Sequence, residues 1–266
     1  MFILNQNGNL KYYTISSFEE TGMTKHCFTT RCGGVSKGYY SSMNLRWNCD
    51  DAPKNIEKNY EIICNEIGID KNRLVLSKQV HEANVHTVKD SDIGNGIMFP
   101  NKFDSADALI TDKTNVAITV FGADCVPLFF LDPKNRVIAL AHSGWKGTVL
   151  RIGQRVVEKM VSDYNSNPSD ILTAIGPSIQ VCHFEVGDEV ADKFIDEFGY
   201  ETVEKHGEKY HVNMQRAIKM QFRDAGILNS HIDDSAICTY CRHDLLFSHR
   251  QTQGKRGVMG GFLALK

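Results

Sequence analysis

The stretch from residue 115 to residue 164 places the tightest limits on the fold. Residues 115–121, 126–131 and 136–141 are short apolar runs of the kind that form buried β-strands. A Gly-Ala-Asp-Cys bend at 122–125 and an Asp-Pro-Lys-Asn turn at 132–135 separate them. Residues 146–164 follow with apolar side chains at helical spacing and predict one long helix. The chain must therefore fold around buried strands, with a helix close behind them.

Reactive side chains stand at the ends of these runs. Cys125 closes the first bend, and His142 directly follows the third run. A thiol and an imidazole at the ends of buried strands suit either metal binding or nucleophilic catalysis. His81 closes an earlier apolar strand in the same way and is a candidate third metal ligand. Asp124 would orient the histidine, move a proton, or cap the bend through its side chain.

The remaining pattern predicts elements along the whole chain. Strands are expected at residues 11–15, 25–31, 73–88 (two strands with His81 at the turn between them), 171–175 and 255–265, with 11–15 at a sheet edge. Further helices are expected at residues 52–68, 187–198 and 213–225, the first with Asp51 as N-cap and Gly68 at its end. No repeat, low-complexity linker or break in composition divides the chain, so residues 1–266 are expected to form one domain.

Composition narrows the class of protein. The formal net charge is −2 and no basic run is present, which argues against a nucleic-acid binder. No apolar run reaches the ~18 residues that span a membrane, and the N-terminus lacks the pattern of a signal peptide. We therefore expect a cytoplasmic protein, monomeric or homodimeric, whose eight cysteines are free thiols and which binds neither membrane nor nucleic acid.

Cys238-x-x-Cys241 is a second candidate for metal binding or redox chemistry. The motif supplies two ligands, and His243 nearby would add a third. No second Cys-x-x-Cys is present to complete a four-cysteine site, so two unlinked thiols in a loop are the simpler interpretation.

Several basic groups are candidates for binding an anion. Arg31, Arg250 and Arg256 carry guanidinium groups, whose fork of donors fits an oxyanion. Arg31 precedes a glycine-bearing loop at residues 33–38, whose exposed amides would add donors. The strand-to-helix turn at residues 143–147 offers free amides and the charge of Lys146.

The motifs together are typical of one family. They occur along the chain as Thr30-Arg-x-Gly-Gly-Val-Ser-x-Gly-x-Tyr-x-Ser-Met-Asn-Leu45, Gln79-Val-His81, Ala106-Asp-Ala-Leu-Ile-Thr111, Ala123-Asp-Cys-Val-Pro127, Ala141-His-Ser-Gly-Trp-Lys-Gly-Thr148, Ile175-Gly-Pro-Ser-Ile179 and Phe247-Ser-x-Arg250. With these motifs the chain resembles the YfiH-like family. Its members are also called laccase-domain or polyphenol oxidase-like proteins and are described as multifunctional purine nucleoside enzymes.

The resemblance implies both a fold and a chemistry. The fold would be α+β, a single-domain four-layer α/β/β/α sandwich with mixed sheets. The reactions would be phosphorolysis of adenosine, inosine and methylthioadenosine to a free base and a sugar 1-phosphate, and deamination of adenosine to inosine. Zinc would be the metal, and purine nucleosides and inorganic phosphate the small-molecule partners.

The zinc ligands are what the resemblance implies, and the other residues are candidates from the chemistry of their side chains. Zinc would be held by His81, Cys125 and His142, and these three residues, together with Asp124, would form the catalytic group. Phosphate and nucleoside binding would involve Arg31, Asn44, Lys146 and Arg250.

Four positions depart from the family pattern. Glu82 and Arg46 stand where relatives often have glycine, His183 stands where a second cysteine often follows the one matching Cys182, and Gln251 replaces the second arginine of an Arg-Arg pair. The first three changes bear on the shape and polarity of the pocket, and the last removes a charge available to phosphate.

Two other functions fit the same residues. A cysteine hydrolase or deamidase would use Cys125 as nucleophile and His142 as base, and a non-catalytic protein would bind zinc without turnover. Copper-dependent oxidation is disfavoured, because one cysteine and a few histidines do not supply the several histidine-rich copper sites that four-electron oxygen chemistry requires.

Overall fold

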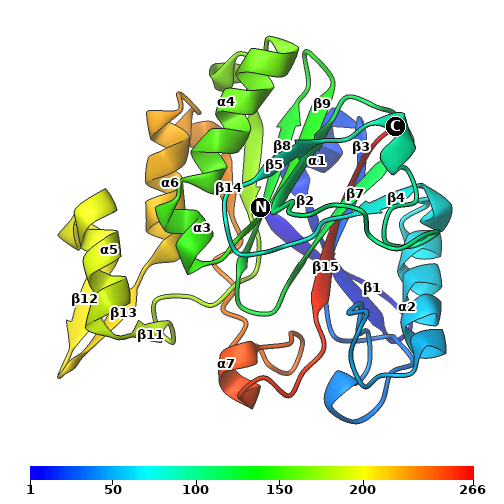
Figure 1. Ribbon diagram of the computed structural model, residues 1–266, viewed down its shortest axis with the longest axis horizontal. Coiled ribbons are helices and arrows are strands. Elements are labelled where there is room, and N and C mark those ends of the chain that lie inside the picture. The colour runs from blue at the N-terminus through cyan, green and yellow to red at the C-terminus, as the bar shows by residue number, and fades with distance from the viewer.

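Two six-stranded sheets form the centre of the computed structural model, which describes all residues from 1 to 266 (Figure 1). The first sheet has the order β1 (Phe2–Asn7), β2 (Leu10–Ile15), β3 (Thr24–Thr29), β15 (Met259–Leu265), β7 (Ala117–Gly122), β4 (Leu74–Leu76). Its neighbours are antiparallel except for the parallel pair β4 and β7.

The second sheet is mixed as well. Its order is β14 (Ile232–Asp234), β10 (Leu172–Ile175), β8 (Val126–Asp132), β9 (Val137–Ser143), β6 (Ala108–Thr111), β5 (Val85–Thr87). The two outer pairs are parallel and the central strands are antiparallel. A small third sheet contains β11 (Glu185–Val186), β13 (Lys209–Val212) and β12 (Val203–His206).

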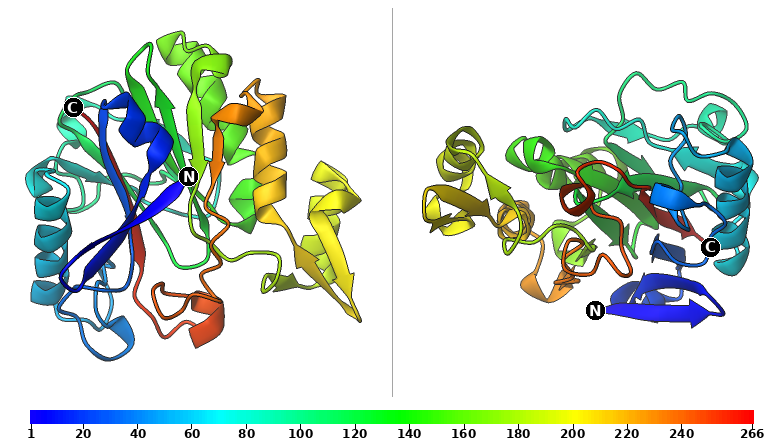
Figure 2. Two further views of the ribbon diagram at one scale, coloured as in Figure 1. Left: turned by 180° about the vertical axis from the view of Figure 1, so that it is seen from behind. Right: turned by 90° about the horizontal axis from the view of Figure 1, so that it is seen from below.

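Seven α-helices surround the sheets. They are α1 (Ser16–Thr21), α2 (Pro53–Glu66), α3 (Trp145–Val149), α4 (Ile152–Tyr164), α5 (Asp188–Phe198), α6 (Met214–Asp224) and α7 (His249–Thr252). Together with the third sheet, α5 projects from the side of the main body (Figures 1 and 2). None of these helices combines the length and the apolar character needed to cross a lipid bilayer.

Successive side chains of a buried strand point to opposite faces of its sheet. They form three apolar interfaces between four layers of secondary structure. In β8, Phe129 and Leu131 face the first sheet, while Leu128 and Phe130 face the helices α4 and α6. The outer face of the first sheet packs against α2 through a third cluster that contains Tyr60. The predicted four-layer α/β/β/α arrangement with mixed sheets is confirmed.

The N-terminal edge of the first sheet differs from the prediction. Residues 11–15 were expected at a sheet edge, but β2 lies inside the sheet because β1 pairs with it along its whole length. The sequence pattern does not reveal β1, since neither of its faces is buried and both Ile3 and Leu4 are exposed. The periodicity of a half-buried strand is therefore absent there.

The long helix expected at residues 146–164 is two helices. The chain breaks between α3 and α4 at Arg151, which has a left-handed backbone with φ of 59°. The buried side chain of Gln221 in α6 supplies the hydrogen bonds lost at the break: it donates to the carbonyl of Thr148 and accepts from the amide of Gly153. The hydrogen bonds of the backbone are replaced at this break, and the apolar side chains keep their helical spacing on both sides of it. The sequence pattern therefore does not reveal the break.

The start of α2 also differs from the prediction. Its N-cap is Ala52 rather than Asp51, and no side chain caps the helix. Asp51 instead accepts hydrogen bonds from Asn44 and Asn55. The end is as predicted, because Gly68, with φ of 65°, follows the last turn. The helices predicted at 187–198 and 213–225 are confirmed as α5 and α6.

Candidate functional site

The site lies where the chain passes twice from the first sheet to the second. His81 is on the connection from β4 to β5, and Cys125 is on the bend from β7 to β8. His142 is the penultimate residue of β9, which pairs with β8. These two connections are joined by Gln79, whose side chain donates to the carbonyl of Phe121 at 2.8 Å and accepts from its amide at 2.7 Å. The two connections and the end of β9 therefore bring His81, Cys125 and His142 together.

The donor atoms of His81, Cys125 and His142 all lie within 4.8 Å of one another. The two imidazole rings meet edge to face, with ring centroids 4.8 Å apart. His142 is buried, Cys125 is partly buried and His81 is exposed, so the cluster opens to solvent on one side. These three residues are the ones predicted from the sequence, and the fold places them within reach of a single metal ion.

Asp107 holds both histidines in place from a fully buried position just before β6. Its carboxylate accepts hydrogen bonds from the backbone amides of Val80, His81 and Glu82, at 3.1, 2.9 and 3.2 Å. His81 has φ of 61°, which turns these successive amides toward one anion. The same carboxylate lies 3.5 Å from Nδ1 of His142, an ion-pair distance that is long for a hydrogen bond.

The electrostatics of the cluster favour charged side chains. Burial raises the pKa of Asp107, but His142 and the surrounding amides outweigh it and hold that pKa below its usual value. Burial would likewise raise the pKa of Cys125, yet the two histidines lower it. Burial opposes the protonation of His142, but Cys125 and Asp107 raise its pKa. Both pKa shifts favour the pairing of a Cys125 thiolate with a His142 imidazolium in the metal-free protein.

A metal ion fits this donor set. Nδ1 of His142 faces Asp107, which leaves Nε2 for the cluster, and a histidine ligand commonly turns its other nitrogen to a carboxylate in this way. Gly144 lines the cluster so closely that a Cβ atom there would lie 3.0 Å from Nδ1 of His81 and 3.2 Å from Sγ of Cys125. Two imidazoles and a thiolate are the ligands that zinc takes in catalytic sites, with a further position open.

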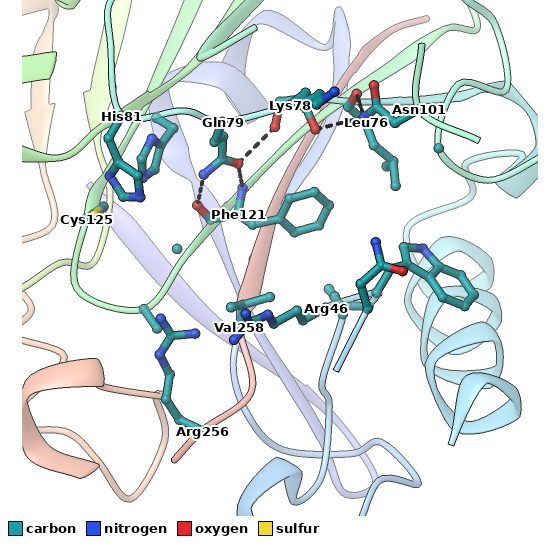
Figure 3. Close-up of a pocket in the computed structure, with 18 of the residues that line it drawn as sticks. Arg46, Leu76, Lys78, Gln79, His81, Asn101, Phe121, Cys125, Arg256 and Val258 are labelled. Carbon is teal, nitrogen blue, oxygen red and sulfur yellow. Dashed lines mark hydrogen bonds between the residues drawn. The ribbon is translucent and has the colours of Figure 1, made fainter. Parts of the chain in front are cut away.

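A cavity of about 800 Å³ extends from this cluster. Figure 3 shows His81, Cys125 and Gln79 on one side of it, Phe121 in the middle, and Arg46 and Arg256 on the opposite side. Its volume is in the range of sites that bury a small organic ligand. The mixture of apolar surface, amides and two guanidinium groups suits a ligand with an aromatic part and an anionic part.

Arg46 and Arg256 lie close enough to affect each other. Burial, followed by the charge of Arg46, lowers the pKa of Arg256. Neither guanidinium forms an ion pair; Arg256 contacts only the carbonyl of Gly257 and Nδ1 of His249. Two cations that line a cavity without a carboxylate partner are suited to binding an anion. Arg256 is a predicted candidate for this role, whereas Arg46 stands out in the sequence only as a departure from the family pattern.

The other residues considered for phosphate binding do not line this cavity. Arg31 donates to the carbonyls of Ser41 and His243 and lines a separate surface pocket. The guanidinium of Arg250 donates to the carbonyls of His183 and Glu185.

Lys146 and Asn44 also have partners elsewhere. The Nζ atom of Lys146 lies 3.6 Å from Glu82 on a half-exposed side chain. Asn44 is fully buried; it donates to Asp51 and accepts from the amides of Arg46 and Val258. Asn44 therefore positions two segments that line the cavity, whereas Lys146 stands outside it.

Asp124 is next to the cluster but turns away from it. One carboxylate oxygen accepts from the hydroxyl of Thr239 at 2.6 Å, and the other accepts from the amide of Arg250 at 2.7 Å. The residue has φ of 102°, so its hydrogen bonds stabilise an unusual backbone at the bend. This geometry favours the capping role over proton transfer.

Two positioning residues, Asp107 and Gln79, received no individual role from the sequence. Both stand inside motifs that were recognised, and the signal for Asp107 is a carboxylate directly before an apolar strand. Such a residue, when buried, needs hydrogen-bond donors, and the amides beside His81 supply them.

Comparison with known proteins agrees with the motif-based resemblance. "Purine nucleoside phosphorylase YlmD" of Bacillus subtilis (strain 168) is 34% identical over 246 residues, covering 90% of this chain and 87% of the relative. The structure of YlmD from Geobacillus stearothermophilus matches with a TM-score of 0.90 and 31% identity over 100% of both chains. That of the Bacillus licheniformis hypothetical protein YfiH matches with a TM-score of 0.91 and 30% identity over 99% of each chain.

The family model described as "Multi-copper polyphenol oxidoreductase laccase" matches residues 25–266. This match spans both large sheets from β3 onward, as well as all the residues of the cluster and the cavity. The chain therefore belongs to the multi-copper polyphenol oxidoreductase laccase family, the group of YlmD and YfiH.

Proposed function

We propose that this chain is a zinc-dependent purine nucleoside phosphorylase that cleaves adenosine, inosine and methylthioadenosine and also deaminates adenosine. One observation carries the proposal: a single cavity joins the His81, Cys125 and His142 cluster to the paired guanidinium groups of Arg46 and Arg256. The name of the Bacillus subtilis relative supports the phosphorolytic part.

In the proposed phosphorolysis, Arg46 and Arg256 bind inorganic phosphate. A phosphate oxygen forms a bond to C1′ of the ribose while the bond from C1′ to N9 of the purine breaks. The electron pair leaves with the base, and the proton of the hydrogen phosphate ends on the base. The products are a free base and a sugar 1-phosphate. The guanidinium groups hold the nucleophile in place and reduce its repulsion from the leaving base, so their contribution is positioning and charge stabilisation.

The substrate would span the cavity. We place the base toward the cluster, the ribose over the apolar surface of Phe121 and the phosphate at the arginines. Deamination would require C6 of adenine to face the cluster, where water adds, the bond from C6 to its amino nitrogen breaks and ammonia leaves.

His81, Cys125 and His142 would hold the zinc ion. Zinc supplies Lewis acidity and lowers the pKa of a water in its open position. Asp107 keeps His142 oriented and fixes the backbone of His81, so the donor atoms are arranged before the ion binds. Two histidines and one cysteine also suit a single copper ion, so metal content has to be measured together with activity.

The test is a product assay on metal-analysed protein. Adenosine is supplied with and without inorganic phosphate, and adenine, ribose 1-phosphate and inosine are quantified for wild type and Cys125→Ser. We expect adenine and ribose 1-phosphate only with phosphate, inosine in both conditions, and loss of all three products in the variant. If zinc-loaded wild type forms no product from any purine nucleoside, the proposed activity is wrong, and a non-catalytic zinc-binding protein is the remaining interpretation.

A cysteine hydrolase is the second candidate, because the structure aligns Cys125, His142 and Asp107. The thiolate is adjacent to His142, and Asp107 rather than Asp124 lies behind the imidazole. This is the order of a nucleophile, a base and an orienting acid. The two candidates respond oppositely to metal removal, because only the phosphorylase needs the metal. Protein that keeps full activity after a chelator has removed its metal would favour the hydrolase.

A further inference from the structure

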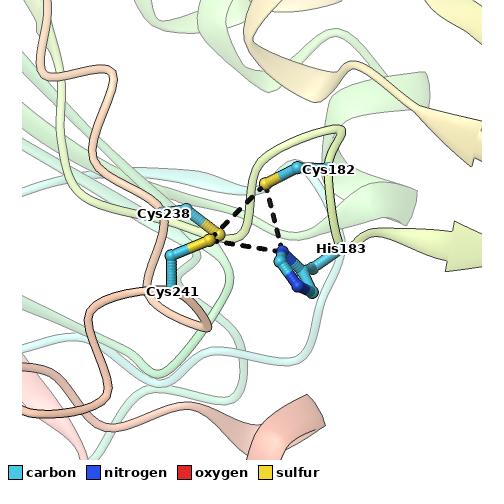
Figure 4. Close-up of side chains that lie close together, drawn as sticks. All are labelled: Cys182, His183, Cys238 and Cys241. Carbon is cyan, nitrogen blue, oxygen red and sulfur yellow. Dashed lines mark hydrogen bonds between the residues drawn. The ribbon is translucent and has the colours of Figure 1, made fainter.

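A second group of metal-ligating side chains lies outside the cavity just described. Cys182 and His183 come from the connection between β10 and β11, and Cys238 and Cys241 from the segment between β14 and α7 (Figure 4). Their four donor atoms all lie within 4.8 Å of one another. Cys238 is buried, His183 is partly buried, and the other two cysteines are exposed.

Three distances among Cys182, His183 and Cys241 are close to those of a tetrahedron around one ion. With zinc–sulfur bonds of about 2.3 Å and zinc–nitrogen bonds of about 2.0 Å, tetrahedral geometry separates two sulfurs by about 3.8 Å and a sulfur from a nitrogen by about 3.5 Å. Sγ of Cys182 lies 3.8 Å from Sγ of Cys241. Nδ1 of His183 lies 3.1 Å from the first sulfur and 3.4 Å from the second.

The two contributing segments are held together independently of any ion. The amide of Thr239 donates to the carbonyl of Ser178, so the backbones are already paired beside Cys238. The ring of His183 stacks on Tyr240 with centroids 4.0 Å apart, which fixes the direction of Nδ1. Arg250 donates to the carbonyl of His183 at 3.3 Å, which holds the backbone of that ligand. The ligands are thus oriented in advance, as structural metal sites require.

We propose that Cys182, His183, Cys238 and Cys241 bind a structural zinc ion. Three thiolates and one imidazole form a complete tetrahedral set, and a complete set leaves no open position for a substrate. This site therefore stabilises the protein rather than catalysing a reaction. It does not depend on the reaction proposed above, because the two clusters share no ligand.

The four-donor set corrects the expectation drawn from the Cys-x-x-Cys motif. His243 was the nearby histidine considered, but its Nδ1 faces the carbonyl of Tyr240, and it is not part of the cluster. A disulfide between Cys182 and Cys241 would use only two of the four donors. It would give no reason for Nδ1 of His183 to face both sulfurs.

The second site also supports the first through the backbone. Thr239 and the amide of Arg250 are the two partners of Asp124, which stabilises the bend that carries Cys125. A zinc ion at Cys238 and Cys241 fixes the segment that contains Thr239. We therefore expect removal of this ion to increase hydrogen exchange both in residues 237–250 and at the bend, even in protein whose first cluster stays loaded.

Metal counting tests the proposal. Protein grown with zinc and purified without chelator is analysed for zinc per chain, for wild type, Cys238→Ser/Cys241→Ser, Cys125→Ser and the control Cys32→Ser, whose partly buried cysteine belongs to neither cluster. We expect two zinc ions in wild type and in the control, and one in each of the other variants. One zinc in wild type together with none in Cys125→Ser would overturn the proposal.

A matched pair at position 183 guards against variants that fail to fold. His183→Cys keeps four donors and should retain the second ion, whereas His183→Ala keeps three and should lose it to a competing chelator far more readily. Cobalt(II) used as a probe should show strong thiolate charge-transfer absorption that falls in His183→Ala and survives in Cys125→Ser. Equal retention of the ion by both variants at position 183 would contradict the proposal, as would six rather than eight free thiols in denatured, metal-free wild type, because that count indicates a disulfide.

Discussion

At the scale of single residues, Asp107 connects the two histidines of the metal cluster more directly than any other group. Its carboxylate collects three backbone amides around His81 and stands behind His142. Both carboxylate oxygens accept hydrogen bonds, so replacing either oxygen with an NH2 group would remove at least one of these bonds. The residue thus acts on the metal only through the groups that it positions.

Asp107→Asn is expected to weaken metal binding without removing a ligand. The new amino group must face at least one backbone N–H, which leaves a buried donor unsatisfied at a cost of about 1–3 kcal/mol. Loss of such a supporting carboxylate typically reduces metal affinity by about 10–100-fold. Chelator competition measures the affinity. Asp92→Asn is the matched control, since Asp92 pairs with His86 at 2.9 Å and accepts from the amide of Lys89, away from the cluster. Equal affinity losses in the two variants would refute this role.

Gly144→Ala tests the space inside the cluster. The backbone of Gly144, with φ of −74° and ψ of 175°, accepts alanine without strain, but the added Cβ would lie 3.0 Å from Nδ1 of His81. We expect zinc affinity to fall by at least about tenfold, since the ligands have to move apart. Gly187→Ala is the control, because Gly187 is also a helix N-cap with an extended backbone and has open space at Cβ. Unchanged zinc affinity in Gly144→Ala would show that the donor atoms do not enclose an ion there.

Residues differ in how far the sequence predicts them. His81, Cys125 and His142 follow apolar runs, and strand ends converge in a sandwich, so their proximity could be expected. Arg46 could not, because its direction depends on a loop that Asn44 fixes by accepting hydrogen bonds from the amide of Arg46 and from that of the distant Val258. Arg31 was placed beside a glycine-bearing loop correctly, but that loop lines another surface.

At the scale of elements, strands with at least one buried face were predictable and strands without a buried face were not. The central strands β8, β9 and β15 are entirely buried and were predicted from their apolar runs. The missed strands β1 and β12 are largely exposed and β13 is mostly partly buried, so tertiary pairing rather than composition selects their conformation. The split of the helix at Arg151 has the same origin, because its compensating side chain comes from another helix.

Strand β3 contains a group that makes stability depend on pH. His26 is buried, accepts the amide hydrogen of Ile15 at 2.9 Å, and has a pKa that burial lowers from 6.5 to about 4. Above pH 6.5 the residue is neutral in both states and adds no pH dependence. Below it, the unfolded chain binds a proton that the folded protein does not, so the free energy of unfolding falls, by about 2 kcal/mol at pH 5 and about 3 kcal/mol once pH 4 is passed.

Urea unfolding of wild type and His26→Gln at pH 7 and pH 5 checks this dependence. The variant should be less stable at pH 7, yet it should lose about 2 kcal/mol less than wild type on acidification. His206→Gln is the control, because His206 is exposed. The other titrating groups cancel in the comparison, so parallel losses in wild type and His26→Gln would rule out His26 as the source.

At the scale of the whole molecule, the cavity joins segments that belong to different sheets. His81 and Cys125 lie on connections between the two sheets, Arg256 precedes β15 in the first sheet, and Arg46 follows the loop that packs on α2. A ligand that spans the cavity therefore bridges the layers of the sandwich. Binding should then raise the stability of the entire fold, because any ligand that binds only the folded state does so by mass action.

Phosphate binding can consequently be measured without turnover. At a phosphate concentration about 100 times its Kd, the free energy of unfolding should rise by about 2.7 kcal/mol, seen as a higher melting temperature. Arg46→Ala and Arg256→Ala should each lose most of this increase, because each removes one of two guanidinium groups that line the cavity without an ion-pair partner.

Arg31→Ala and Arg250→Ala are controls of equal charge change, since both side chains donate to backbone carbonyls outside the cavity. Sulfate provides a second oxyanion, which should compete at the same pair. If the phosphate-dependent increase disappears in Arg31→Ala or Arg250→Ala and persists in the variants of Arg46 and Arg256, the anion binds at the residues predicted from the sequence and not in the cavity.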